Sequence, residues 1–208
     1  MKRLAVFLYA ILAGICVSIG GLTYLSIENK VVGAVFFYIG LLAVCTNGYS
    51  LFTGKVAYVF ERDKSFALDI PVIWLGNLVG SFLMGSLTRM TRLTGVVERA
   101  VAVADTKLGD GLLSVFILAI FCNFLICVAV DGYARNPHEL GKYLSMFFGV
   151  VCFVICGFEH CVANMFYFTA ADAWSGKTML WLLVMTLGNG VGGVVIPLSR
   201  KFWERAQK

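Results

Sequence analysis

Long apolar segments without charged residues dominate this sequence. The first runs from about Leu4 to Ile27 and contains no Asp, Glu, Lys or Arg. An α-helix needs about 20 consecutive apolar residues to cross the hydrocarbon core of a bilayer. Further segments of this kind follow at about residues 31–60, 66–87, 111–130, 140–171 and 178–198. The sequence therefore predicts an all-α membrane protein with six transmembrane helices.

The composition also leaves lipid as the only solvent that suits this chain. Hydrophobic residues make up 60% of its 208 residues, charged residues make up 14%, and the mean hydropathy is +0.86. A soluble domain would be about 45–50% apolar and about 25% charged. The chain has only three prolines, and no polar low-complexity stretch interrupts it. We therefore expect a single transmembrane domain over residues 1–208.

The first apolar segment has a second interpretation. Met1-Lys2-Arg3 followed by an apolar run also resembles a secretory signal peptide. The run is, however, longer than the hydrophobic region of such peptides, and no small-residue cleavage site closes it cleanly. A retained first transmembrane helix is favoured.

The seven cysteines all lie inside apolar segments. Cysteines at bilayer depth usually act as small hydrophobic residues rather than as disulfide partners. Their spacing matches no zinc site, and only two histidines are present to complete one. We expect no disulfide, no bound metal and no cofactor.

The distribution of Lys and Arg predicts the orientation in the membrane. Six crossings place both termini on one side, and a cytoplasmic position for them puts eleven of the 17 Lys and Arg residues inside. We expect a multi-pass protein of the inner (plasma) membrane with cytoplasmic termini. The net charge of +5 does not indicate nucleic-acid binding, because the basic residues lie in short loops rather than on one helix face.

One exterior connection is unusually basic. Residues 88–110 contain Arg89, Arg92, Arg99 and Lys107, which are four of the six exterior basic residues. This stretch could form an amphipathic helix at the membrane interface, with arginines that reach toward water. It could also form a positive collar that concentrates anions at a pore mouth. The sequence is compatible with both interpretations.

A short motif occurs twice, about half the chain apart. The string LGNLVGS at residues 75–81 matches LGNGVGG at residues 187–193, 112 residues later. Leu51-Phe52 and Met165-Phe166 match at nearly the same offset. The motif therefore predicts duplicated halves. Because each half has three crossings, the halves must be inverted relative to each other, as in many transport proteins.

The predicted halves, about residues 1–100 and 105–208, each have a long middle segment that polar residues interrupt. Residues 46–54 read TNGYSLFTG, and residues 157–164 read GFEHCVAN. Irregular backbone at membrane depth is tolerated only where protein or water satisfies its hydrogen bonds. Broken helices at corresponding positions indicate a permeation site. We therefore predict that the second and fifth helices are broken and that the protein transports a solute.

Glu159 and His160 are the only adjacent ionisable pair inside an apolar segment. A charge at the bilayer centre costs at least about 2.5–3.5 kcal/mol, so such residues rarely lack a role. For Glu159 we favour a structural role, in which its carboxylate holds backbone amides freed at the helix break. His160 is the better functional candidate, because imidazole can gain or lose a proton near neutral pH.

One of these polar strings resembles the signature of a known protein family. The string GFEHCVANMF at residues 157–166 closely resembles the signature of the formate/nitrite transporter family, which moves formate, nitrite, hydrosulfide and related monovalent anions. Leu51-Phe52-Thr53 resembles the loop in that family's broken second helix, and residues 187–193 resemble the break in its sixth helix. The resemblance covers essentially the whole chain. It implies an aquaporin-like fold of six helices, assembled in the membrane lipid as a homopentamer with one pore per subunit.

The resemblance also implies a set of pore residues. His160 would be the central one, hydrogen-bonded near Thr53 and Asn189. The residues that would form the apolar constrictions on either side of it, or lie near the inner one, are Phe37, Leu41, Phe153, Leu51 and Phe52.

Three further roles follow from the same resemblance. Lys107 would supply positive potential near the selectivity region, while Glu159 and Asn164 would support the helix break. Longer members of the family have a cytoplasmic helix before the first crossing. Only about three residues precede that crossing here, so we do not expect gating by such a helix.

The predicted pore suggests how a small monovalent anion and a proton would cross together. A bare anion should not pass two apolar rings, because the cost of removing its water is prohibitive. An anion drawn in by a positive field could instead take a proton from His160 or from bulk water. It would then pass as the neutral weak acid, with a flux that rises as the pH falls.

Three alternatives have weaker support in the sequence. A neutral-solute pore of aquaporin type should carry twin Asn-Pro-Ala repeats, and none is present. An intramembrane enzyme would need paired histidines, paired carboxylates or a nucleophile with its base. A purely structural membrane protein would not need two helices interrupted by polar residues.

Overall fold

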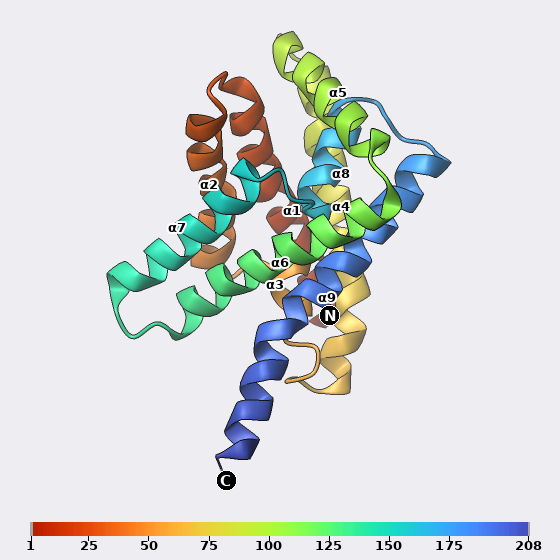
Figure 1. Ribbon diagram of the computed structural model, residues 1–208. Coiled ribbons are helices and arrows are strands. Elements are labelled where there is room, and N and C mark those ends of the chain that lie inside the picture. The colour runs from red at the N-terminus through yellow and green to blue at the C-terminus, as the bar shows by residue number, and fades with distance from the viewer. Residues whose placement is uncertain (1, 208) are drawn as a thin grey trace.

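The computed structural model describes residues 2–207, and over this range the chain is all-helical. Asn29, Asp63 and Ser175 cap three of the helices by accepting hydrogen bonds from backbone N–H groups of the first turn. In chain order, the helices are α1 (Lys2–Ser26), α2 (Lys30–Asn47), α3 (Phe52–Val56), α4 (Lys64–Arg89), α5 (Thr94–Gly109), α6 (Leu112–Arg135), α7 (Glu139–Ile155), α8 (Cys161–Ala170) and α9 (Gly176–Ala206) (Figure 1).

Five of these helices are long and apolar enough to cross a membrane, namely α1, α2, α4, α6 and α9. The predicted second segment, residues 31–60, contains α2 and the short α3, with residues 48–51 between them. The predicted fifth segment, residues 140–171, contains α7 and α8, with residues 156–160 between them. The first connection falls within the polar stretch at residues 46–54, and the second, except for Cys156, falls within the stretch at residues 157–164.

Two helices differ from what hydropathy alone predicts. Hydropathy predicts that the last crossing ends near residue 198, but α9 continues to Ala206. Polar residues do not end a helix by themselves, and here Arg200 on the extension forms ion pairs with Glu61 and Asp131 at 2.9 and 2.7 Å. The basic connection at residues 88–110 contains α5, a helix of 16 residues that packs against α8.

The helices pack in two corresponding sets. In the first set, α1 lies against α2 and α4; in the second set, α6 lies against α7 and α9. The sets meet through α2 and α7, and each short helix reaches across, so that α3 contacts α6 and α9 while α8 contacts α1 and α4. In Figure 1, α9 crosses α6 and continues alone to the C-terminus. The short helices therefore lie where the two sets meet.

Close helix contacts depend on glycines from the repeated motif. A Cβ on Gly76 of α4 would lie 2.5 Å from the Cβ of Ala10 on α1. A Cβ on Gly188 of α9 would lie 2.6 Å from the Cβ of Ala119 on α6. Because real Cβ atoms do not approach so closely, these positions admit only glycine without a shift of the backbone. Small residues at such contacts are typical of helices packed in lipid.

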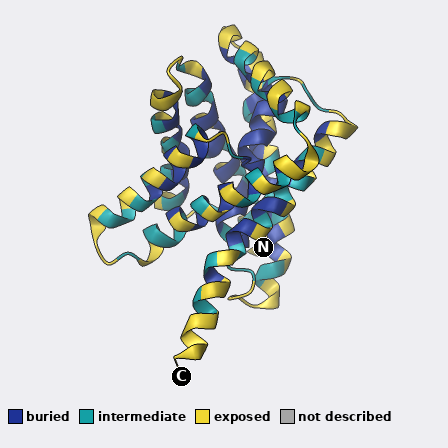
Figure 2. Cartoon of the chain, in the orientation of Figure 1, coloured by how far each residue is buried: buried dark blue, intermediate teal, exposed yellow. Residues whose placement is uncertain are grey.

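Buried residues face the inside of the bundle, and exposed residues cover its outer faces (Figure 2). Many exposed side chains are large and apolar, including Leu113 at 72%, Leu140 at 71% and Leu187 at 65% exposure. Water is a poor solvent for such a surface, whereas lipid tails suit it. The fold therefore fits a membrane.

Candidate functional site

Both connections between a long and a short helix start with the same local geometry. Gly48 has φ 69° and Gly157 has φ 71°, a left-handed conformation that glycine adopts without steric cost. The next residues, Tyr49 and Phe158, each donate a backbone hydrogen bond to a carbonyl five residues earlier, at 3.0 Å in both cases. These bonds close the ends of α2 and α7, after which the chain turns toward the middle of the bundle.

Asn77 of α4 holds the first connection in place. Its Oδ1 accepts a hydrogen bond from the backbone N–H of Phe52 at 2.8 Å. Its Nδ2 donates to the carbonyls of Ser50 at 2.9 Å and Ala10 at 2.7 Å. The Asn77 side chain therefore hydrogen-bonds to backbone groups on both sides of Leu51, and these groups have no partner within a helix.

Asn189 of α9 makes the same set of hydrogen bonds at the second connection. Its Oδ1 accepts from the backbone N–H of Cys161 at 2.9 Å, and its Nδ2 donates to the carbonyls of Glu159 and Ala119, both at 2.8 Å. The sequence placed Asn189 beside His160. The structure shows that it holds the backbone on either side of His160.

These bonds correct one match between the predicted halves. Phe52 and Cys161 occupy the same position in the two hydrogen-bond sets, so Leu51 corresponds to His160. The sequence pairing of Leu51-Phe52 with Met165-Phe166 is therefore wrong. It fails because a constant offset was assumed, whereas the asparagine follows its partner by 25 residues in the first connection and by 28 in the second.

His160 precedes α8 and is buried, with only 3% of its surface exposed. Its Nδ1 accepts a hydrogen bond from the backbone N–H of Ala163 at 3.1 Å, which caps the helix. The neutral ring then carries its proton on Nε2, and this atom lies 3.0 Å from Oγ1 of Thr53 on α3. The structure thus brings together His160 and Thr53, 107 residues apart, as expected.

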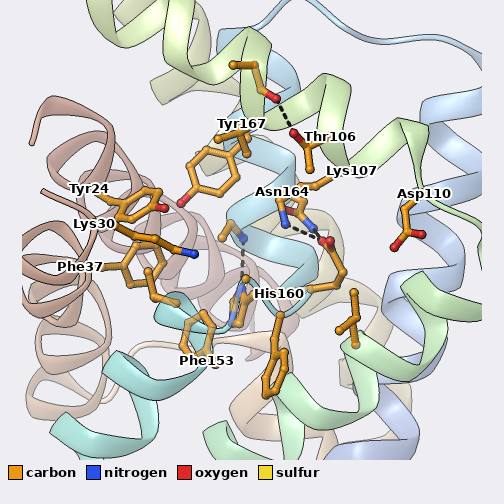
Figure 3. A pocket seen from close by; sticks show the side chains of 18 residues that line it. Tyr24, Lys30, Phe37, Thr106, Lys107, Asp110, Phe153, His160, Asn164 and Tyr167 are labelled. Carbon is orange, nitrogen blue, oxygen red and sulfur yellow. Dashed lines mark hydrogen bonds and ion pairs between the residues drawn. The ribbon is translucent and has the colours of Figure 1, made fainter. Parts of the chain in front are cut away.

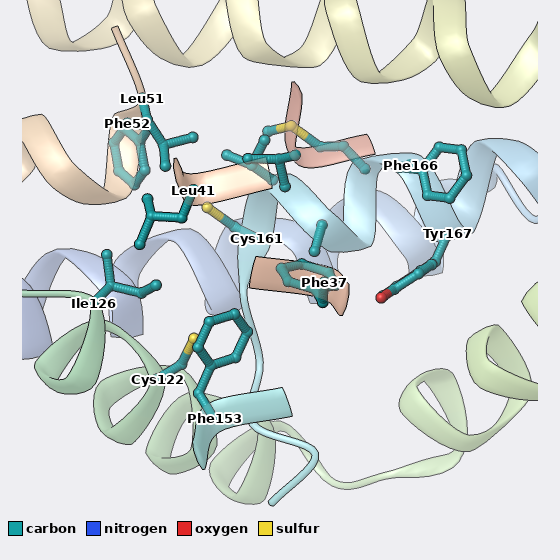
Figure 4. Packing of buried hydrophobic residues seen from close by; sticks show 14 of the residues in the cluster. Phe37, Leu41, Leu51, Phe52, Cys122, Ile126, Phe153, Cys161, Phe166 and Tyr167 are labelled. Carbon is teal, nitrogen blue, oxygen red and sulfur yellow. The ribbon is translucent and has the colours of Figure 1, made fainter. Parts of the chain in front are cut away.

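Aromatic rings cover one side of the imidazole. Phe153 stacks on His160 with ring centroids 5.6 Å apart and an interplanar angle of 19°. Phe37 meets Phe153 edge to face at 5.7 Å. Leu41, Leu51 and Phe52 are also buried and lie together in Figure 4, away from the pair of phenylalanines. All five predicted constriction residues therefore lie in the buried core, with Phe153 directly against His160.

Glu159 has partners other than those predicted. Its carboxylate accepts hydrogen bonds from Nζ of Lys107 at 2.7 Å and from Nδ2 of Asn164 at 2.6 Å (Figure 3). The expected role of holding backbone amides belongs instead to Asn77 and Asn189. Because the carboxylate compensates its charge, Lys107 is not the free source of positive potential that the sequence suggested.

The other basic residues near α5 are also largely engaged. Arg89 forms a bidentate pair with Asp172 at 2.5 and 2.6 Å. Arg99 donates to the carbonyl of Leu25 at 2.9 Å and lies 3.4 Å from Glu28. These contacts fasten α5 and its neighbours to the loops beside them. Most basic residues of this stretch therefore do not contribute uncompensated positive charge to a collar at the pore mouth.

Two cavities are lined by predicted pore residues. The first, which we call the His160 cavity, has a volume of about 500 Å³, and its lining includes Phe37, Lys107, Phe153 and His160. The second, which we call the Lys55 cavity, has a volume of about 590 Å³, and its lining includes Leu41, Leu51 and Lys55. Six of the predicted pore residues therefore line one cavity or the other. The remaining three line neither, and they are Phe52, Asn189 and the fully buried Thr53.

Two asparagines were missed by the sequence-based selection of site residues. Asn77 was noted only as part of the repeated motif, and its match to Asn189 is the signal that could have revealed its role. Asn123 of α6 donates from Nδ2 to the carbonyls of Thr53 at 3.1 Å and Asn189 at 2.6 Å. An uncharged polar residue in an otherwise apolar crossing is a weaker signal, because many such residues only hydrogen-bond along their own helix.

Comparisons with known proteins agree with this arrangement. A family model described as "Formate/nitrite transporter" matches residues 1–201. An uncharacterized transporter of Bacillus subtilis, YrhG, is 33% identical and covers 80% of this chain and 68% of its own. The nitrite transporter NirC of Salmonella typhimurium is 31% identical, over 92% of this chain and 76% of its own.

Comparison with solved structures points to the same family. A solved structure described as a pentameric formate channel with formate bound superposes with a TM-score of 0.83 at 26% identity. The match covers 100% of this chain and 98% of that one. The fold and the site thus define a membrane transport protein of the channel type. The chain belongs to the formate/nitrite transporter family, whose named relatives are transporters and channels rather than enzymes.

Proposed function

We propose that this protein carries small monovalent anions such as formate, nitrite or hydrosulfide across the membrane through a pore centred on His160. The observation that carries the proposal is the position of this histidine, buried between apolar side chains and next to the His160 cavity, with Thr53 at its Nε2. The names of the relatives, which include nitrite and formate transporters, support the same class of substrate.

The proposed path runs from one cavity to the other. Phe37 and Phe153 restrict it on the side of the His160 cavity, and Leu41 and Leu51, with Phe52 behind them, restrict it on the side of the Lys55 cavity. An ion without its water would pay a prohibitive desolvation cost at such apolar constrictions. A neutral weak acid of the same size would pay far less. The anion therefore crosses together with a proton.

His160 is the group best placed to handle that proton. It lies at the apolar constriction, and a hydroxyl group is within hydrogen-bond distance of its Nε2. The proton comes ultimately from water in the cavity. If the anion takes it from Nε2 of His160, the imidazole takes a proton back from water in the same step, so that the ring is neutral before and after. In either case the concentration of neutral acid rises as the pH falls, so the flux of anion plus proton rises as well.

The proposed architecture is an aquaporin-like domain over residues 1–208 with six crossings in two inverted halves. In this architecture α2 with α3, and α7 with α8, are the broken second and fifth helices. The matched hydrogen bonds of Asn77 and Asn189 and the corresponding helix contacts support it. We further propose a homopentamer in the inner membrane, with cytoplasmic termini and one pore per subunit.

Flux into liposomes tests the proposal. Protein reconstituted into liposomes should carry formate, nitrite or hydrosulfide at initial rates above those of protein-free liposomes, and the rates should increase from pH 8 to pH 5. The His160→Ala variant should lose most of this flux. Unchanged flux in His160→Ala would sink the role of His160.

Two controls separate the alternatives. Trp203→Phe, at an exposed tryptophan near the end of α9, changes an aromatic residue far along the chain from the cavities and should leave flux unchanged. Water and glycerol permeability, measured by liposome swelling, tests the neutral-solute pore. Rapid glycerol entry without anion flux would contradict the proposed substrate class.

A further inference from the structure

The His160 cavity contains polar groups that the proposed proton step does not use. Lys30, Tyr24 and Tyr167 all line this cavity, together with Phe37. They come from three different helices or their ends: Tyr24 from α1, Lys30 from the first turn of α2, and Tyr167 from α8. The sequence-based selection of site residues included none of them.

The backbone brings these three side chains to one corner of the cavity. The ring of Tyr24 packs against Gly33, one turn after Lys30, where a Cβ would lie 3.0 Å from it. The ring of Tyr167 packs against Gly21, one turn before Tyr24, where a Cβ would lie 3.2 Å from it. Figure 3 shows the Lys30 ammonium and both hydroxyl groups directed into the same part of the cavity.

These donors have no partners among residues 2–207. Neither tyrosine hydroxyl is in a hydrogen bond, although Tyr167 has only 6% of its surface exposed. No carboxylate lies within 4.0 Å of the Lys30 ammonium in the described part of the chain. The other charges in the cavity are engaged, because Lys107 pairs with Glu159 and the Asp110 carboxylate accepts from Ser114 and Gly111.

We propose that Lys30, Tyr24 and Tyr167 form a binding subsite for monovalent anions that have two acceptor oxygens. This inference rests on the proposed anion transport and adds a substrate preference to it. The ammonium supplies the opposite charge, and the two hydroxyls supply one donor for each oxygen of a carboxylate or of nitrite. Hydrosulfide offers a single, larger sulfur atom that is a weaker hydrogen-bond acceptor, so it gains less from the two hydroxyls.

The subsite would act before the apolar constriction. It lies above Phe37 in the cavity, on the approach to His160 (Figure 3). An anion held there keeps its charge and its hydrogen bonds until it meets a proton. It therefore loses its water in two steps, first on entering the subsite and then on passing the apolar constriction. Formate and nitrite are thereby collected at low concentration, whereas hydrosulfide gains mainly the attraction of the ammonium.

Concentration-dependent flux into liposomes tests this inference. The double variant Tyr24→Phe/Tyr167→Phe should raise the apparent KM for formate and for nitrite about tenfold, which is typical for the loss of hydrogen bonds to a charged group. Its KM for hydrosulfide should stay within about twofold of the wild-type value. Lys30→Gln should raise the KM of all three anions, because it removes the charge.

Matched variants make the outcomes distinct. Lys30→Arg should keep most of the affinity, and Lys177→Gln should change nothing, because Lys177 lies outside this cavity against Trp181 at 5.0 Å. If Lys177→Gln raised the apparent KM as much as Lys30→Gln, the effect of Lys30 would be that of a general surface charge, and the proposed subsite would be overturned. Equal KM values for the double variant and the wild type would also overturn it. Loss of formate and nitrite flux in the wild type would instead contradict the proposed function.

Discussion

At the scale of single residues, the Lys107–Glu159 pair shows what a buried charge requires. Only 12% of the Lys107 side chain and 4% of the Glu159 side chain are exposed, and their charged atoms are 2.7 Å apart. Removing both ions from water is costly, and their attraction repays that cost only while both are present. The pair connects α5 to the residue before His160, so it also fixes the backbone from which the imidazole projects.

Breaking this pair should therefore destabilise the protein more than removing it. We expect Lys107→Met to lower the free energy of unfolding by about 3 kcal/mol, because it leaves a buried carboxylate without its partner. The double variant Lys107→Met/Glu159→Gln should recover at least half of that loss. The melting temperatures of the variants in detergent, monitored by size-exclusion chromatography after heating, give the comparison. Equal melting temperatures for the single and double variants would contradict it.

At the scale of elements, the sequence locates the polar strings but not the side chains that satisfy them. The string at residues 46–54 contains the first connection, and the string at 157–164 contains all of the second except Cys156. An apolar helix cannot tolerate so many hydrogen-bonding groups without satisfying them. The partners that satisfy them come from α4 and α9, and only folding shows which of their polar residues reach the breaks. The same limit applies to Lys107, whose charge is readable in the sequence while its pairing with Glu159 is not.

The left-handed glycines at these breaks allow a clean test. Gly157→Ala should lower the free energy of unfolding by about 1–2 kcal/mol, because a Cβ is strained at φ 71° although it would touch no atom within 4 Å. Gly190→Ala is the matched control, since that helical glycine has equal space and no such conformation. Melting temperatures of the two variants decide the point, and a larger loss in Gly190→Ala would refute the conformational explanation.

At the scale of the whole molecule, each chain contains a complete candidate site. Residues of one chain line both cavities and hold His160 between its apolar neighbours. The candidate site is thus built from the residues of one chain. Assembly would instead cover part of the exposed apolar surface. Hydropathy alone does not tell which of these residues face lipid and which face a neighbouring subunit.

Subunits of the proposed pentamer should therefore act independently. When wild-type and His160→Ala chains are co-expressed in varied ratios and purified together through a tag on each, the flux per chain should rise linearly with the wild-type fraction. Native mass spectrometry of the purified sample should give the mass of five 22.8 kDa chains. A steep, non-linear loss of flux would show that the pores are coupled.

The two asparagines also have a consequence for how the chain is made. Every partner to which the side chain of Asn77 hydrogen-bonds precedes it in the sequence, and the same is true of the Asn189 side chain. During synthesis, the first connection thus stays unsatisfied until α4 has left the ribosome, and the second until α9 has. We expect each connection to become ordered only when the helix that carries its asparagine has packed. A chain that ends before residue 189 should therefore leave the backbone on both sides of His160 without these hydrogen bonds.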